Sequence, residues 1–191
     1  MKLSDQIDFE VQCLRDYFER LFLLANETSK IQPPFPSESD LAKQFGTELA
    51  KQFVSDSVAA FIRPDMACNI YSLLDFWLTK LCSFHEGKRN LPLNHTDIKG
   101  RTQLDAYHKY FTKVALLDLT AVLPSLECLN SLREVRNCVI HGGAHVSEAK
   151  RKRIETIPGI SVVGSLVVIS DDFIWDSLEH ARTYLRAVAT A

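Results

Sequence analysis

Apolar side chains recur every three or four positions along most of the chain, and this spacing predicts a largely helical protein. The first such stretch covers residues 3–26, where charged side chains fall on the opposite face of the helix. A proline-containing loop over residues 29–37 separates it from a second helix, which we place at about residues 37–61. Residues 65–85 form the most apolar stretch, and we expect them to be the central core helix.

The second half of the chain adds further helices. A polar loop over residues 86–97 precedes apolar positions that predict a helix over residues 98–117, with a start at or after Gly100. A proline suits the first turn of the next helix, which we place at residues 124–141. The last helix is expected to follow the capping sequence Ser170-Asp171-Asp172.

One short segment breaks the helical pattern. Residues 160–163 and 166–169 are rich in β-branched side chains and flank Gly164-Ser165, which predicts a β-hairpin with a two-residue turn. Because two strands are not stable alone in water, this hairpin must lie on the bundle or pair with another chain. The predicted fold class is therefore an all-α bundle of about five to seven helices, with one small β-hairpin before the last helix.

Composition limits the classes of function. The length of 191 residues suits a single domain, and the 7 Gly and 7 Pro leave room for long helices. The formal net charge is -2, so any contact with RNA must come from a local basic patch. The dense basic run of the chain, which could follow an RNA backbone or form a solvated charged turn, consists of Lys150, Arg151, Lys152 and Arg153.

The cysteines and the apolar runs indicate a compartment. The 5 cysteines are odd in number and contain no C-x-x-C pair, so we expect reduced core residues in a cytoplasmic protein. No apolar run is long enough to span a membrane, and we identify no signal peptide. The sequence has no glycine-rich phosphate loop, and we expect no cofactor.

A polar cluster lies at the end of the helix predicted over residues 124–141. Asn137 and His141 are four residues apart and point to the same helix face, whereas Arg136 projects about 100° away from Asn137. Gly142 and Gly143 then stop the helix, which leaves His141 in the last turn, where the helix dipole favours a cation. A guanidinium, an amide and an imidazole at one helix end suit a phosphate group.

This Arg-Asn-x-x-x-His-Gly pattern resembles the Arg-x4-6-His signature of the HEPN superfamily. The resemblance implies that Arg136 and His141 are catalytic and that Asn137 is the polar residue beside them. A second match is the helix containing Asp75, whose carboxylate would either orient Arg136 or be a structurally paired or solvent-facing group. A third match runs from residue 97 to Phe111, so the likeness covers about residues 65–190, with residues 1–60 as a helical extension of the same domain.

The resemblance carries expectations about activity. Many HEPN proteins are metal-independent ribonucleases of toxin–antitoxin and antiviral defence systems, in which the 2′-hydroxyl of RNA attacks the phosphate and leaves a 2′,3′-cyclic phosphate. It further implies a homodimer with a shared cleft, and an antitoxin or other defence-system protein as a partner. Gly143 stands where some HEPN toxins have a tyrosine that receives AMP, so this mode of regulation is not expected.

Three other interpretations remain open. The chain could be a HEPN-like subunit that binds RNA, a nucleotide or a partner protein without cutting. The signature could instead be structural, with a salt-bridged arginine and a histidine that caps the helix. His141 and His145 have the spacing of metal ligands on a helix, but the two glycines between them should break that helix, so we expect no metal.

Overall fold

The computed structural model describes all residues except 1, 29–60, 90 and 92. Its described part contains six α-helices and one antiparallel pair of strands, which precedes the last helix. The expectation of a mainly helical fold with a small hairpin at this position is thus confirmed for the described residues. The helix predicted over residues 37–61 and the proline loop before it lie almost entirely outside them.

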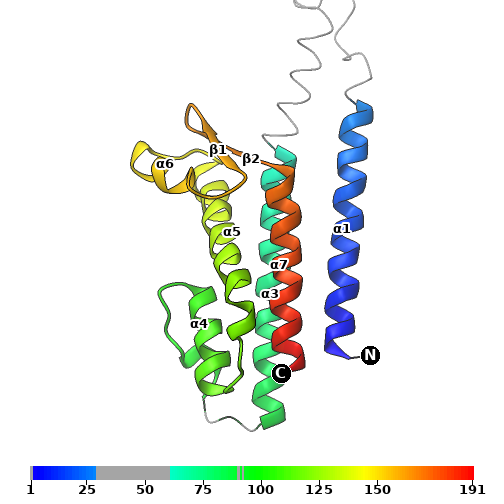
Figure 1. Ribbon diagram of the computed structural model, residues 1–191, viewed down its shortest axis with the longest axis vertical. Coiled ribbons are helices and arrows are strands. Elements are labelled where there is room, and N and C mark those ends of the chain that lie inside the picture. Colours follow the sequence, from blue (N-terminus) through cyan, green and yellow to red (C-terminus); the bar gives the residue numbers. More distant parts are fainter. Residues whose placement is uncertain (1, 29–60, 90, 92) are drawn as a thin grey trace, which may run out of the picture.

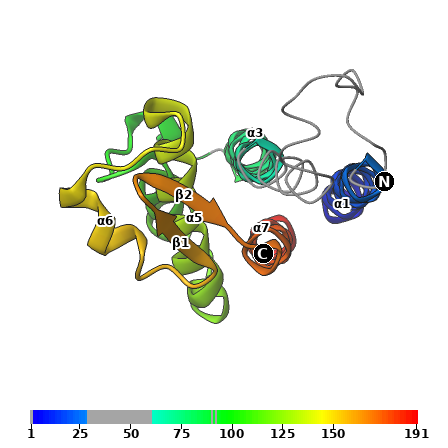
Figure 2. The same cartoon turned by 90° about the horizontal axis from the view of Figure 1, so that it is seen from above.

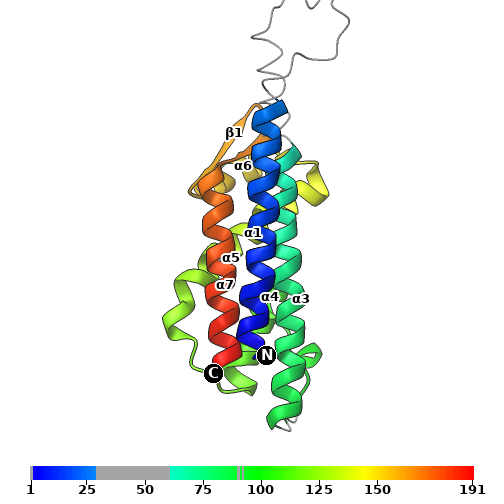
Figure 3. The same ribbon diagram turned by 90° about the vertical axis from the view of Figure 1, so that its right-hand side faces the viewer.

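Three long helices run side by side, and a fourth covers two of them from the opposite side. The three are α1 (Leu3–Thr28), α3 (Arg63–Arg89) and α7 (Asp171–Thr190). Figures 1 and 3 show them nearly parallel in their long axes, and Figure 2 shows α5 (Leu123–Gly142) on the far side of α3 and α7 from α1. The bundle therefore has α3 and α7 at its centre, as the apolar pattern of residues 65–85 predicts.

Shorter elements connect the long helices. Between α3 and α5 the chain forms a small side layer of short helices, and after α5 it forms a cap at one end of the bundle (Figure 1). The short elements are η2 (His95–Asp97), α4 (Gln103–Lys109), the π-helical turn η3 (Tyr110–Val114), η4 (Thr120–Val122), α6 (Glu148–Ile154), β1 (Ile160–Val163) and β2 (Leu166–Ile169).

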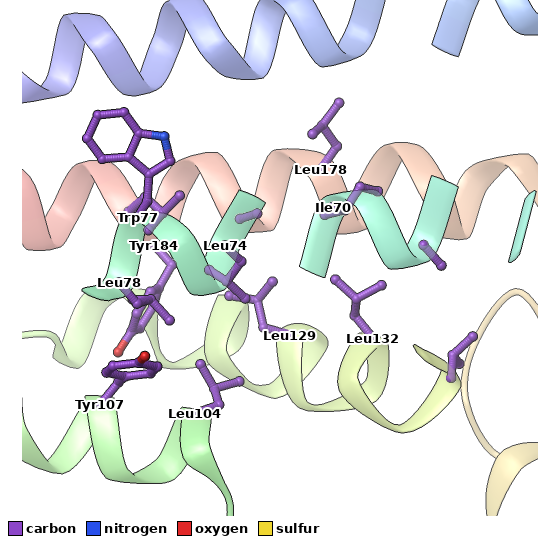
Figure 4. Close-up of a cluster of buried hydrophobic side chains, with 14 of the residues drawn as sticks. Ile70, Leu74, Trp77, Leu78, Leu104, Tyr107, Leu129, Leu132, Leu178 and Tyr184 are labelled. Atoms are coloured by element: carbon purple, nitrogen blue, oxygen red, sulfur yellow. The ribbon is translucent and has the colours of Figure 1, made fainter. Parts of the chain in front are cut away.

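The hydrophobic core lies where α3, α4, α5 and α7 meet (Figure 4). Trp77, Tyr110 and Tyr184 are its largest fully buried side chains, and the polar atoms of Trp77 and Tyr184 have partners. The Trp77 indole nitrogen donates to Glu10 of α1 over 2.8 Å, and the Tyr184 hydroxyl lies 2.9 Å from His108 Nδ1. Burial of this apolar surface supplies the main free energy that holds the four elements together.

Helix ends agree with the sequence where a local cap decides them. The Ser170 hydroxyl accepts from the Phe173 amide over 3.2 Å and starts α7, and α5 ends at Gly142 with Gly143 at φ 58°. Two helix ends differ from the prediction. Helix α3 continues to Arg89, beyond the predicted end at residue 85. The helix after Gly100 starts late, at a Thr102 cap, and widens into a π turn that ends at Val114.

Close backbone packing explains the late start. A Cβ atom on Gly100 would lie 2.5 Å from the amide nitrogen of Ala106, so the chain folds tightly over the first turn of α4 before the helix begins.

The cysteine prediction also needs correction. All five cysteines are free, but only Cys82 is buried, and Cys13 is exposed on α1.

The hairpin lies on the bundle, which is one of the two predicted outcomes. Its strands pair from Ile160↔Ile169 to Val163↔Leu166, so Gly164 and Ser165 form the predicted two-residue turn. The loop after α5 adds to this sheet, because the Val146 amide donates to Ser165 over 2.9 Å and the Val167 amide donates to Ala144 over 2.8 Å. The hairpin is thereby fixed against the C-terminal end of α5.

We expect the stability of the fold to decrease as the pH falls through about 6.5. Fully buried His85 lies 2.9 Å from the Val188 carbonyl through Nε2, and its Nδ1 has no partner among the described residues. Burial lowers the pKa of His85 below its ordinary value, and burial lowers the pKa of His108 in the same direction. The unfolded chain therefore binds protons first on acidification, which favours unfolding.

Thermal melts followed by circular dichroism test this expectation. The melting temperature should be lower at about pH 5.5 than at about pH 7.5, and His85→Gln should make this difference smaller. A melting temperature of the parent protein that is the same at both values contradicts the assignment of a neutral, buried imidazole.

Candidate functional site

A cleft of about 480 Å³ lies at the C-terminal end of α5, between that helix and α6. The end of α5 shapes it, because Gly143 and Ala144 both have positive φ values, of 58° and 65°, and turn the chain back along the helix. The Ala144 amide closes this turn by donating to the Cys138 carbonyl over 3.1 Å. The cleft is lined by Arg133, Glu134, Asn137, Cys138, His141, Gly142, His145, Val146, Ser147, Lys150, Arg153 and Ile154.

Asn137 and His141 both line this cleft, as their four-residue spacing predicts. Asn137 is half-buried and His141 is exposed, so the imidazole is open to solvent and to a ligand. Glu134 is three residues before Asn137 and lines the cleft as well, which puts a carboxylate, an amide and an imidazole in one row on α5. Glu134 was missed in the sequence, although its helical spacing from Asn137 and His141 was visible.

Arg136 does not line the cleft. Its guanidinium lies over the ring of Tyr71 on α3, with the Cζ atom 5.6 Å from the ring centroid. Its Nη1 donates to Asn137 Oδ1 over 3.1 Å. This hydrogen bond uses the amide oxygen of Asn137 as the acceptor, and the Nδ2 group of the same amide carries two N–H donors. Arg136 is thus bonded to Asn137, which lines the cleft together with His141.

Glu134 holds two arginines at the wall of the cleft. Its Oε1 accepts from Arg133 Nη2 over 3.2 Å and also from Arg153 of α6. Glu134 and Arg133 are largely buried, with 17% and 20% of their side chains exposed, whereas Arg153 is 72% exposed. This pairing orders the wall of the cleft and leaves the Arg153 guanidinium accessible to solvent.

One donor in this wall has no partner. The Nε atom of Arg133 is buried and makes no hydrogen bond with any described residue. A buried donor of this kind costs about 1–3 kcal/mol unless it is satisfied.

The basic run divides between two faces because it forms a helix instead of a charged turn. Lys150 and Arg153 line the cleft, where with Arg133 they oppose the single carboxylate of Glu134. Arg151 is used elsewhere: it pairs with Glu155 and donates to the hairpin carbonyls of Gly164 and Val162 over 3.2 and 3.3 Å.

Lys152 is exposed and does not line the cleft. Of the predicted basic run, Lys150 and Arg153 therefore line the cleft, and Arg133 joins them from α5.

Asp75 lies on α3, outside the cleft, and makes no ion pair with Arg136. The charges of Asp75 and Arg136 both influence the pKa of Tyr71. Burial raises the pKa of Tyr71, and the Asp75 charge raises it further, while the charges of Arg133 and Arg136 oppose that rise.

The position of His145 differs from the expectation drawn from the sequence. The glycines do break the helix after Gly142, but the turn that follows returns the chain, and His145 lines the same cleft as His141. Its Nδ1 lies 2.8 Å from the Ser165 hydroxyl in the hairpin turn.

Neither a reactive thiol nor a metal cluster is found at the cleft among the described residues. Burial raises the pKa of the Cys138 thiol, and the nearby Lys150 charge only partly opposes this, so Cys138 is a poor thiolate. Among the described residues no group of three or more His, Cys, Asp or Glu side chains is arranged to hold a metal ion.

Comparison with known proteins gives no relative from which to transfer a function. No model of a protein family, no curated protein and no solved structure matches the chain. Within the part of the chain that the structure describes, no helix is both long and apolar enough to cross a membrane.

Proposed function

We propose that the cleft is the active site of a metal-independent endoribonuclease of the HEPN type, acting on RNA in the cytoplasm. The main support is the arrangement of cations at the cleft. Arg133, Lys150 and Arg153 line it in a chain whose formal net charge is -2. A phosphate supplies oxygen acceptors and negative charge for these groups.

The proposed reaction needs no group beyond side chains. RNA carries its own nucleophile, the ribose 2′-hydroxyl, so the protein has only to hold the phosphate and move protons. Arg153 and Lys150 hold the phosphate, and Asn137 donates to it through Nδ2 while Arg136 fixes the amide. His141 transfers a proton at a ribose oxygen, and the products are a 2′,3′-cyclic phosphate and a 5′-hydroxyl.

Incubation of the purified protein with single-stranded RNA in the presence of EDTA tests the activity directly. We expect cleavage that EDTA does not change, with 2′,3′-cyclic phosphate ends. Absence of cleavage under all conditions removes the nuclease proposal. Cleavage that EDTA abolishes contradicts the metal-independent chemistry.

One observation favours the second candidate function, a HEPN-like module that binds RNA, a nucleotide or a partner protein without cutting. Arg136, the catalytic arginine that the resemblance implies, packs on Tyr71 and does not line the cleft. A cationic cleft without that arginine can still bind a phosphate. RNA that binds tightly to the purified protein but stays intact supports this alternative.

We also propose that the protein is a homodimer with the two α5 helices facing each other. Ile140 is 53% exposed near the C-terminal end of α5, so this helix presents an apolar side chain to solvent there. A two-fold axis at this patch brings the same residues of both subunits together and doubles the groups around the phosphate. An antitoxin or another defence-system protein is the expected heterologous partner of such an enzyme.

Light scattering of the purified protein at micromolar concentration should show a dimer. Ile140→Asp should shift it to a monomer, because the change puts a charge into the interface. Leu23→Asp is the matched control, since Leu23 is 64% exposed on α1, far from α5 in sequence. A parent protein that is monomeric throughout contradicts the dimer and weakens the nuclease proposal.

A further inference from the structure

The cleft contains two imidazoles, and the proposed reaction requires two proton transfers. The 2′-hydroxyl must lose a proton to a base, and the departing 5′-oxygen must receive one from an acid. His141 can serve only one of these roles in a given step. His145 lines the same cleft, is exposed, and comes from the turn that follows α5.

Three contacts fix His145 in place. Its amide donates to the Gly142 carbonyl over 2.9 Å, and its backbone forms an antiparallel bridge with Leu166 of β2. Its ring is held by the hydrogen bond of 2.8 Å between Nδ1 and the Ser165 hydroxyl. A base whose ring is oriented by a third group is the arrangement that proton-transfer sites use, because the second nitrogen then has a defined direction.

We propose that His145 is the general base of this site and that Ser165 is its positioning residue, with His141 as the general acid. The inference rests on the proposed endoribonuclease function. In the neutral tautomer that donates Nδ1–H to Ser165, the lone pair of the imidazole is on Nε2. His141 lies in the last turn of α5 and lines the cleft, where its imidazole is exposed.

The step balances without another reactant. His145 Nε2 takes the proton of the 2′-hydroxyl while that oxygen bonds to phosphorus, and the bond between phosphorus and the 5′-oxygen breaks as His141 gives that oxygen a proton. The cyclic phosphate and the 5′-alcohol leave with His145 protonated and His141 neutral, and exchange with water restores both. The charged or titratable side chains that line the cleft together with the two histidines are Arg133, Glu134 and Cys138 on α5 and Lys150 and Arg153 on α6.

This assignment also explains the hairpin. Its two-residue turn presents Ser165 to His145, and Arg151 of α6 holds that turn by donating to Gly164 and Val162. The hairpin thus contributes to the site through Ser165, although Ser165 itself does not line the cleft.

Two kinds of substrate separate the base from the acid. The first is ordinary single-stranded RNA, and the second is the set of four nucleoside 3′-(4-nitrophenyl phosphates), whose leaving group departs without a proton. His145→Ala should lose about 10²–10⁴-fold in rate on both kinds, because the base is always required. His141→Ala should lose that factor on RNA but stay within about tenfold of the parent on the aryl esters.

Ser165 variants test the positioning role. Ser165→Ala should lower kcat by about tenfold with little change in KM, whereas Ser165→Thr should retain the parent rate because its hydroxyl can make the same contact. In pH–rate profiles, His145→Ala should lack the limb on the acidic side. If Ser165 had only a structural role, Ser165→Ala and Ser165→Thr would not differ in kcat in this way.

Several outcomes overturn the inference while leaving the proposed function intact. One is that His145→Ala cuts RNA at the parent rate. Another is that the aryl esters rescue His145→Ala, which would make His145 the acid. If instead the parent protein cuts neither kind of substrate, the proposed function itself fails.

Discussion

His141→Ala should reduce the rate of RNA cleavage by about 10²–10⁴-fold and leave the affinity for RNA nearly unchanged. The imidazole lines the cleft and is exposed, so its loss removes a proton donor without opening a hole in the core. The cations that hold the phosphate, Arg153 and Lys150, stay in place. Single-turnover cleavage and filter binding with the same RNA measure the two quantities separately.

A matched histidine provides the control. His180 on α7 contacts Ser125 at the other end of α5 through Nδ1 over 3.1 Å and does not line the cleft. His180→Gln should therefore cut RNA at the parent rate. If His141→Ala also cuts at the parent rate, the signature is structural, and the non-catalytic binding module becomes the better description.

Arg136→Ala should reduce the rate by roughly 10²-fold, because misplacement of a positioned group by about 1 Å has that effect. Arg136 holds Asn137 by the 3.1 Å hydrogen bond and is itself held on Tyr71, so its removal frees the amide to rotate. Arg136→Lys should recover little, since an ammonium group lacks the planar fork of the guanidinium.

A variant of Asn137 distinguishes the positioning role of Arg136 from the direct contact of Asn137 with RNA. Asn137→Asp keeps an oxygen for Arg136 but replaces the Nδ2 donor with a negative oxygen, so it should weaken RNA binding as well as the rate. Arg20→Ala is the control, because Arg20 is an exposed arginine on α1 outside the cleft. A rate for Arg136→Ala equal to that of the Arg20 control contradicts the role of Arg136.

Local rules of the sequence determined most helices and turns of this protein. The apolar spacing of residues 3–26, 65–85 and 124–141 predicts three of the four long helices to within a few residues. Gly142-Gly143 and Gly164-Ser165 end α5 and turn the hairpin because both places need positive φ values, which glycine adopts freely. The shared face of Asn137 and His141 follows from helical geometry alone.

Contacts between distant segments decided the rest of the candidate site. Whether Arg136 faces a cleft or Tyr71 depends on how α5 packs against α3, which no local pattern records. His145 enters the cleft only because the loop after α5 pairs with β2, and Glu134 meets Arg153 only because α6 folds back on α5. The sequence determined the helices and turns because local spacing and φ preferences are properties of neighbouring residues, whereas the membership of the cleft depends on tertiary packing.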